Sequence, residues 1–383
     1  MRGRRDVRNT VFLPNSPPLP GNETSGPQQS PDATSVPTSP IMPPKHFPST
    51  SNSTEDHHTA TSDTTSIRSS HTQHTLSGPP SHPELHGPGL NASVVETVNA
   101  WFSEGAATKT FVVGELALAY NPIPGVSSHN SKVRFDNFEV LEKVASNPQF
   151  ISEIPGQEKD KDDRRGEYNI FLPSISRPAP AVAFKYQVHV DQTNISNYCP
   201  IAFKPAWNCE QTQASVILLY SLDPSFSSAA SLDSVTITNL VLTISLDTSP
   251  EDQVTKQPRE VGHATSAVMY PNVGASFRRR HSSVVWKIPE LAVKVNAEGK
   301  FLVRFATSGG MPRKGNVEAK FELRVPNAVN ALGIRAAVDQ QEAEQKESDP
   351  FADEAASADA QPTVTWKDVP TVRKLVAGKY VTS

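Results

Sequence analysis

The sequence has few of the features that mark secreted, membrane-spanning or nucleic-acid-binding proteins. Only two of its 383 residues are cysteines, Cys199 and Cys209, too few for a disulfide framework, so we expect a reduced, cytosolic chain. The apolar runs are shorter than the roughly 18 residues that a membrane-spanning helix needs, and the basic N-terminus lacks the apolar stretch of a secretory signal. The net charge of −4 does not favour nucleic-acid binding.

Motifs that carry catalysis or hold cofactors are also missing from the sequence. We find no glycine-rich phosphate loop, no Gly-x-Ser-x-Gly elbow and no helix motif of metal ligands. The histidines at 57, 58, 71 and 74 match no tetrahedral zinc spacing. We therefore predict no enzyme activity, no cofactor and no metal. The alternative is a catalytic group assembled from residues far apart in the sequence.

Residues 1–88 are predicted to be a disordered linker. Proline, serine and threonine supply 41 of these 88 residues, and Val11–Leu13 is the longest apolar run among them. Such a segment cannot bury enough apolar surface to offset the entropy lost on ordering. Its first residues are basic, with arginines at 2, 4, 5 and 8. We expect this end to be attracted weakly to anionic membranes.

The remainder, 89–383, carries the alternation of apolar and polar residues that is typical of strands with one buried face. Turn residues separate these segments and helical patterns are rare, which predicts an all-β antiparallel sandwich. Val94–Phe102 is ambiguous, because its apolar residues also fit one face of a helix. The clearest alternating segments are 182–190, 240–246, 301–305 and 317–325, and the weaker ones are 111–119, 133–141, 215–220, 284–288, 363–366 and 372–376.

Two polar segments interrupt this pattern. The charged run 157–166 is predicted to be a solvated loop. The second segment, 339–362, holds eight acidic residues, six alanines and a single lysine. Its charge and its lack of large apolar residues predict a flexible acidic insertion before the last strands, although the alanines also permit a transient helix. We call 339–362 the acidic insertion.

Three segments are distinctive in their residue order. GLNASVVETVNAWF and VVGELALAY stand at the start of the folded part, and VVWKIPEL occupies Val284–Leu291. Together with the ending DVPTVRKLVAGKYVTS, they resemble the C-terminal mu-homology domain of the muniscin family, the early clathrin-endocytosis adaptors. The resemblance covers 89–383. It implies an elongated antiparallel mu-homology β-sandwich of two subdomains, with a closing hairpin, and it favours a strand at Val94–Phe102.

The same resemblance implies a function. Muniscins are cytoplasmic adaptors recruited to plasma-membrane clathrin-coated pits, where this domain engages membrane cargo tails and EH-domain scaffold proteins at initiation sites. No F-BAR domain precedes it here, so we do not expect membrane bending, and a truncated gene model or a short homologue would explain the start. The alternatives are a generic β-sandwich recognition module, an enzyme of unknown substrate, or a fragment that does not act alone.

The resemblance also directs attention to Arg373 and Lys374. Adaptor medium chains recognise tyrosine sorting motifs partly through a tryptophan that precedes a Val-Arg pair in their closing strand. Here Thr371 precedes that pair, so the aromatic wall of the pocket is missing and we do not expect this route of recognition. Arg373 and Lys374 stay candidate partner-binding residues. Trp366, on another predicted strand, is expected in the core.

Asp349, Pro350 and Phe351 lie inside the acidic insertion and form an Asp-Pro-Phe tripeptide. Such motifs resemble peptides that dock on clathrin-adaptor appendage domains. Phenylalanine supplies the anchor, proline limits the unbound conformations, and the flanking acids steer toward a basic partner. The sequence therefore predicts an appendage-binding peptide here.

Arg278, Arg279 and Arg280 form a basic run that precedes a predicted strand. Three adjacent guanidinium groups can meet acidic peptides or phosphoinositide headgroups. The alternative is a solvated loop tip. Ser282 follows the run, and a phosphate on it would weaken the positive patch.

Overall fold

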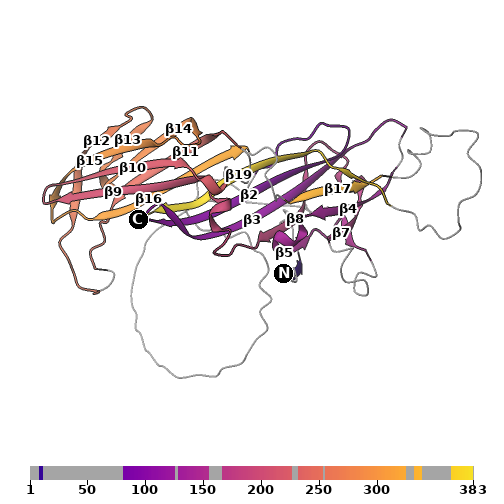
Figure 1. The fold of residues 1–383 in the computed structure, drawn as a ribbon, viewed down its shortest axis with the longest axis horizontal. Helices are drawn as coiled ribbons and strands as arrows, with labels where there is room; N and C mark the ends of the chain where they lie inside the picture. Colours follow the sequence, from indigo (N-terminus) through magenta and orange to yellow (C-terminus); the bar gives the residue numbers. More distant parts are fainter. Residues whose placement is uncertain are drawn as a thin grey trace, which may run out of the picture. The chain divides into compact units, whose positions relative to one another are not determined.

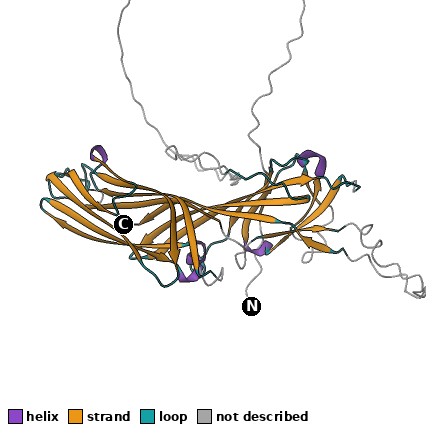
Figure 2. Cartoon of the chain, turned by 90° about the horizontal axis from the view of Figure 1, so that it is seen from above, coloured by secondary structure: helices purple, strands orange, loops and turns teal. Residues whose placement is uncertain are grey.

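The computed structural model describes residues 8–11, 81–125, 128–154, 166–226, 232–252, 255–324, 332–338 and 364–382. Strands dominate these ranges, which confirms the all-β prediction (Figure 2). No helix among the described residues has the length and apolar character needed to cross a membrane. Short 3-10 helices lie at η1 (Phe138–Val140), η2 (Leu172–Ile175), η3 (Ile195–Tyr198) and η4 (Arg279–His281).

The largest sheet, sheet A, is ten-stranded and runs in the order β1-β5-β8-β3-β2-β19-β16-β11-β14-β13 (Figure 1). All of its neighbouring strands are antiparallel except β1 with β5 and β19 with β2, which are parallel. Its strands are β1 (Arg8–Val11), β2 (Gly89–Ser103), β3 (Ala106–Asn121), β5 (Leu141–Ser146), β8 (Ala181–Val188), β11 (Ser234–Leu246), β13 (Ala275–Arg278), β14 (Ser283–Lys294), β16 (Lys314–Arg324) and β19 (Thr371–Thr382).

Two smaller sheets complete the described fold. Sheet C has the order β12-β15-β10-β9, and sheet B has the order β18-β17-β4-β7-β6. Sheet C consists of β9 (Ile201–Glu210), β10 (Gln213–Leu222), β12 (Gly262–Tyr270) and β15 (Gly299–Gly309), and sheet B of β4 (Asn130–Asp136), β6 (Ile151–Glu153), β7 (Glu167–Phe171), β17 (Gly333–Ala337) and β18 (Trp366–Asp368).

Sheets B and C each pack against sheet A, on different strands of it. In the unit formed with sheet B, the ring of Phe135 on β4 lies 4.7 Å from that of Phe184 on β8. In the unit formed with sheet C, the ring centroid of Phe301 on β15 lies 5.1 Å from that of Trp286 on β14. Close ring pairs of this kind stabilise a core beyond the area that they bury. Two sandwich units therefore share sheet A, in agreement with the two subdomains that the family resemblance implies.

Two buried aromatic side chains also join these sheets through hydrogen bonds. The hydroxyl of Tyr380 on β19 donates to the carbonyl oxygen of Ile201 at the start of β9. The indole N–H of Trp286 donates to the carbonyl oxygen of Pro271 at 2.7 Å. Both rings are at most 1% exposed, and buried Tyr and Trp are stable only where their polar ends find such partners. The distinctive VVWKIPEL segment thus supplies a core strand.

The predicted alternation is clearest on β16, where every second residue from Val317 to Leu323 is buried. On β8 the alternation fails at Ala183, which is buried next to Phe184, because the pairing with β3 shifts register there. The ambiguous segment Val94–Phe102 is a strand, part of β2. The predicted strand 133–141 divides into β4, η1 and the start of β5.

The chain ending differs from the closing hairpin that the resemblance implies. β18 pairs with β17 in sheet B, whereas β19 enters sheet A between β2 and β16. Because β18 and β19 lie in different sheets, they do not form a hairpin. The long separation of β19 and β2 in the sequence permits their parallel pairing, since a short turn can join only antiparallel neighbours.

Two parts of the range 1–88 are ordered among the described residues. Arg8–Val11 forms β1 and pairs with β5. Residues 81–88 lie against sheet A, where Leu85 is 6% exposed and its N–H donates to the carbonyl of Pro178 at 2.9 Å. Asn121 donates from its side chain to the carbonyls of Leu85 and Gly87. Disorder of the rest of 1–88 stays a prediction, because those residues lie outside the described ranges.

Candidate functional site

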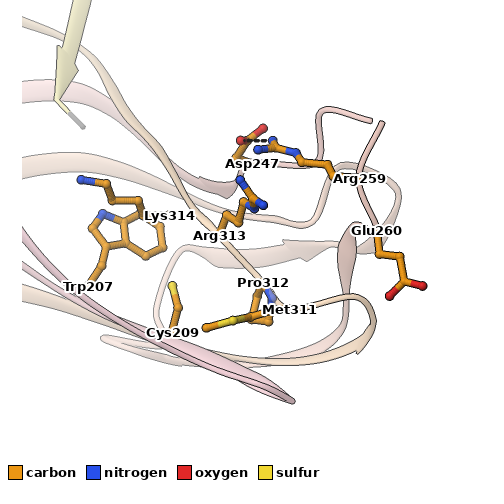
Figure 3. A pocket seen from close by; sticks show the side chains of 9 residues that line it. All are labelled: Trp207, Cys209, Asp247, Arg259, Glu260, Met311, Pro312, Arg313 and Lys314. Atoms are coloured by element: carbon orange, nitrogen blue, oxygen red, sulfur yellow. Dashed lines mark hydrogen bonds and ion pairs between the residues drawn. The ribbon is translucent and has the colours of Figure 1, made fainter. Parts of the chain in front are cut away.

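A hollow of about 630 Å³ lies where sheets A and C meet at one end of their sandwich. Sheet C contributes β9 to its wall, and sheet A contributes the start of β16 and the residue after β11. The connections before β12 and between β15 and β16 close the remaining sides. Its lining side chains are Trp207, Cys209, Asp247, Arg259, Glu260, Met311, Pro312, Arg313 and Lys314 (Figure 3).

The hollow has an apolar wall made of residues that a closed core would cover. Trp207 and Cys209 occupy inward positions of β9, yet both are only partly buried. Met311 is 57% exposed, and Pro312 lies beside it (Figure 3). Methionine adapts its shape and tryptophan offers a large flat surface, so this wall suits an aromatic or aliphatic side chain from a partner.

Charged groups border this wall. Arg259 forms an ion pair with Asp247 and lies 3.6 Å from Asp252, which also pairs with Arg313 at 3.3 Å. Burial raises the pKa of Asp247, but hydrogen bonds from Ser249 and Arg259 outweigh this effect and hold the pKa below its usual value. This carboxylate therefore stays ionised and keeps Arg259 in place.

The lining charges leave the hollow slightly positive. Three cations, Arg259, Arg313 and Lys314, face two carboxylates, Asp247 and Glu260. Arg313 has 48% of its side chain exposed, and Lys314 forms no ion pair with another residue of the described part. Both cations can therefore meet an acidic group that enters the hollow.

The β9 strand beside this hollow is an edge of sheet C. It pairs with β10 on one side and has no strand partner on the other among the described residues. Pro205 within it lacks a backbone N–H, as is typical of edge strands. Edge strands offer unpaired backbone groups to an added peptide strand. The hollow and the β9 edge together form what we call the β9 site.

Trp207 adds a polar feature to this site. Its indole Nε1 is buried and has no hydrogen-bond partner in the described part of the chain. An unpaired buried donor costs roughly 1–3 kcal/mol, so most such groups in native proteins have a partner. Because surrounding atoms cover this nitrogen, a peptide in the hollow could reach it only after the indole ring moves.

The basic run Arg278–Arg280 lies at the end of β13 and in η4, and all three side chains are exposed. Arg279 donates to the carbonyl oxygen of Thr265 on β12 at 2.7 and 3.0 Å. Ser282 is fully buried, and its hydroxyl accepts a hydrogen bond from the N–H of Ala264 at 3.0 Å. A kinase cannot reach this hydroxyl in the folded chain, so a phosphate on Ser282 would require local unfolding.

The structure places Arg373 and Lys374 in internal contacts. Arg373 donates to the carbonyl oxygen of Leu332, and Lys374 Nζ lies 3.3 Å from Glu322 Oε2. Their side chains leave β19 in opposite directions, so they do not form one patch. A partner would have to displace these contacts before it could bind either cation.

Of two other sequence expectations, the first stays a prediction and the second is wrong. Asp349, Pro350 and Phe351 lie outside the described residues, as does the whole acidic insertion. Trp366 is not a core residue, contrary to the prediction. It is partly buried on β18 at the edge of sheet B, with the guanidinium of Arg134 4.8 Å from its ring.

One group of side chains has the composition of a catalytic triad. His82 Nδ1 lies 2.9 Å from the hydroxyl of Ser93, and His82 Nε2 lies 3.7 Å from Glu115. Ser93 is only 1% exposed, however, so no substrate carbonyl can approach its hydroxyl. Lys185 pairs with the same Glu115 at 3.2 Å. These contacts fasten residues 81–88 to sheet A rather than perform catalysis.

The cysteines are equally unsuited to catalysis. Burial raises the pKa of Cys199 to about 11, and the pKa of Cys209 is also raised by burial. A thiol with a raised pKa is mostly protonated at neutral pH and is a poor nucleophile. No cluster of three or more His, Cys, Asp or Glu in the described ranges could hold a metal ion.

Sequence reasoning did not identify the β9 site. Its lining comes from four separate stretches between Trp207 and Lys314, and no local motif joins them. The signal that the sequence does contain is the pair Trp207 and Pro205 in one short segment, where a large aromatic residue accompanies a residue that favours a sheet edge.

Comparison with known proteins adds the family. The family model described as "Muniscin C-terminal mu homology domain" matches residues 88–383. A curated relative, "Suppressor of yeast profilin deletion" from Saccharomyces cerevisiae, is 28% identical over 304 residues, which is 76% of this chain and 29% of the relative. The chain thus spans less than a third of that relative's length.

Solved structures with similar folds have low sequence identity to this chain. The Fcho1 mu homology domain of Danio rerio with bound Eps15 peptide matches with a TM-score of 0.45 and 13% identity, over 78% of this chain and 97% of that one. The yeast delta-COP-I mu-homology domain matches with a TM-score of 0.42 and 12% identity, over 77% and 98%.

Proposed function

Because the chain belongs to the muniscin C-terminal mu homology domain family, a family of protein-interaction domains of endocytic adaptors and not of enzymes, we propose that it gathers short peptides at endocytic sites. Its partners would be segments of EH-domain scaffold proteins and the cytoplasmic tails of membrane cargo. It would act in the cytoplasm, recruited to the plasma membrane where clathrin-coated pits begin. Binding would be reversible and would involve no covalent step.

The β9 site supports this proposal most directly. It combines an edge strand, an apolar wall and exposed cations within one small area. A peptide could add its backbone to the β9 edge while one apolar side chain enters the hollow against Trp207 and Met311. An acidic residue beside that anchor would meet Arg313 or Lys314. The chemistry favours an acidic peptide with one aromatic or large aliphatic residue.

A binding titration tests this role. The full chain would be titrated against a labelled Eps15 peptide, the partner in the solved Fcho1 complex, by fluorescence polarisation. Met311→Asp places a charge on the apolar wall, and Arg313→Glu reverses a cation, each at an exposed position. We expect each variant to weaken binding by roughly tenfold or more, since an interface anchor contributes about 1–2 kcal/mol or more.

Two matched variants control for general effects of charge and surface change. Phe171→Asp also introduces a carboxylate at a half-exposed apolar residue, and Lys132→Glu also reverses an exposed cation, but both lie on sheet B. They should bind like the unmodified chain. An equal loss of peptide binding in the sheet B variants, or no loss of binding in the β9 variants, would refute the proposed site.

The acidic insertion would supply a second contact, in which a peptide of this chain binds to another protein. We propose that Asp349, Pro350 and Phe351 dock on an appendage domain of a clathrin adaptor, with Phe351 as the anchor. A synthetic peptide of the insertion should bind an isolated appendage domain, and Phe351→Ala should abolish this. Unchanged binding by the substituted peptide would refute the role of Phe351 as the anchor. The linker 1–88 would raise the local concentration of these weak contacts.

A further inference from the structure

The outer face of sheet C departs from the usual pattern of an antiparallel sheet. Such a sheet normally places polar residues on the side turned to solvent. Here one row of paired residues crosses all four strands of the sheet as Ala206, Ile217, Leu302 and Tyr270. This row is apolar from one edge to the other, and we call this side of sheet C the apolar face.

The apolar face is strongly exposed along β12. Val268 lies in the next row and is 73% exposed, and Tyr270 is 61% exposed. Val273, in the turn between β12 and β13, is 79% exposed. Side chains so exposed gain nothing from the fold itself, and a contiguous patch of them marks an interaction surface.

Cations surround this apolar row. The outward positions of the four strands carry Lys204, Lys300 and Arg304, against the single carboxylate Glu210. Asn208 and Gln213 both donate hydrogen bonds to that carboxylate, at 3.1 and 2.6 Å. The three cations form no ion pair within the described residues. The face is therefore positive as well as apolar.

The arginine run extends the positive charge along the free edge of β12. Arg279 is held against this strand by its bonds to the carbonyl of Thr265, and Arg278 and Arg280 beside it are exposed. Figure 1 shows β12 and β13 next to each other at the same end of the molecule. The run thus borders the apolar face instead of forming a separate loop.

We propose that the apolar face and its arginine border bind an anionic lipid bilayer. Tyrosine and aliphatic side chains enter the interfacial layer, and lysines and arginines meet the headgroup phosphates. The backbone groups inside a sheet are used by neighbouring strands, so this face offers side chains alone. A bilayer needs no backbone partners, whereas peptide ligands commonly use an edge or a groove. A second copy of the chain is disfavoured, because two such faces would repel each other.

Vesicle flotation tests this inference on the full chain, with Arg2, Arg4 and Arg5 replaced by glutamine to remove the attraction of the N-terminus. The vesicles are phosphatidylcholine, with or without a fifth of phosphatidylserine. The double variant Lys300→Glu with Arg304→Glu should lower the partition coefficient by at least about 30-fold. Each basic residue near an anionic surface contributes roughly 1 kcal/mol to membrane binding, and two such residues are lost. Val268→Ser with Val273→Ser should lower it too, since these side chains would enter the interface. Lys132→Glu with Lys367→Glu, on sheet B, is the matched control and should float normally.

Several results would overturn the inference. Equal flotation by all variants would do so, as would equal binding to charged and uncharged vesicles. Binding to polyglutamate without binding to anionic vesicles would instead assign the face to an acidic protein. The urea midpoints of the variants show whether each is folded. Eps15 peptide binding measured on the same variants separates this inference from the proposed function, since the β9 site lacks these residues and should be unaffected.

Discussion

Gly114 on β3 offers a sharp test of how sheet A is packed. Gly114 pairs with Glu96 of β2 on one side and with Tyr186 of β8 on the other. The Tyr186 ring is fully buried, and its hydroxyl donates to Glu96 Oε1 at 2.9 Å. The ring therefore crosses β3 above Gly114. A Cβ at this position would lie 2.1 Å from Cζ of Tyr186, so Gly114→Ala must displace the ring.

The stability lost in Gly114→Ala is the sum of three effects. Overpacking a core costs roughly 1–3 kcal/mol. Loss of the Tyr186 hydrogen bond to the Glu96 carboxylate costs about 1.5–3 kcal/mol. Alanine offsets about 0.4–1 kcal/mol by restricting the unfolded chain. We expect the free energy of unfolding to fall by about 2–5 kcal/mol, measured by urea denaturation of the full chain.

A double-mutant cycle isolates the cause. Tyr186→Leu removes the ring, so in that background Gly114→Ala should cost less than about 0.5 kcal/mol or become stabilising. The backbone of Gly114 is not in the left-handed region, so alanine adds no strain of its own. If Gly114→Ala costs as much without the ring as with it, the crossing of Tyr186 over β3 is not the reason for glycine here.

Three other predictions concern buried groups. Burial raises the pKa of Glu115, but contacts with His82 and Lys185 outweigh this effect and hold the pKa below its usual value. The stability that this carboxylate contributes is therefore complete above its unfolded pKa and lost as pH falls through the folded value, so Glu115→Gln should flatten the decline of the urea midpoint in acid; an unaltered decline would contradict this. Cys199, with its pKa raised to about 11, should react with iodoacetamide only after unfolding, and rapid alkylation in the native chain would argue against its burial. Trp286→Phe, which leaves the Pro271 carbonyl without its donor, should lower the free energy of unfolding by about 1–3 kcal/mol, and a neutral result in urea denaturation would show that the indole bond is dispensable.

The sequence predicts those strands that have one face in the core and one in solvent. β16 alternates cleanly because Val317, Ala319, Phe321 and Leu323 face the interior and the residues between them do not. In Val94–Phe102 of β2, burial alternates only from Val98 onward, because Val94 and Val95 are both buried, and the apolar Trp101 stands at one of the less buried positions. Only the family resemblance assigned it correctly as a strand.

Pairing order and the candidate site were less accessible to sequence reasoning. Nothing local in the sequence indicates that β19 enters between β2 and β16, because strand order depends on contacts between distant segments. The arginine run was identified from its charge, but its attachment to β12 depends on the carbonyl of Thr265. Arg373 is a candidate only through the family resemblance, and its hydrogen bond to the Leu332 carbonyl depends on a contact between segments far apart in the sequence.

Hydrogen–deuterium exchange of the full chain with and without saturating Eps15 peptide tests peptide docking at β9 most directly. We predict slower exchange of backbone amides in β9 (Ile201–Glu210) and in the connection that contains Met311 and Arg313, with little change in sheet B. Peptide binding that leaves the β9 amides unprotected, or that protects β19 around Arg373 instead, would contradict it.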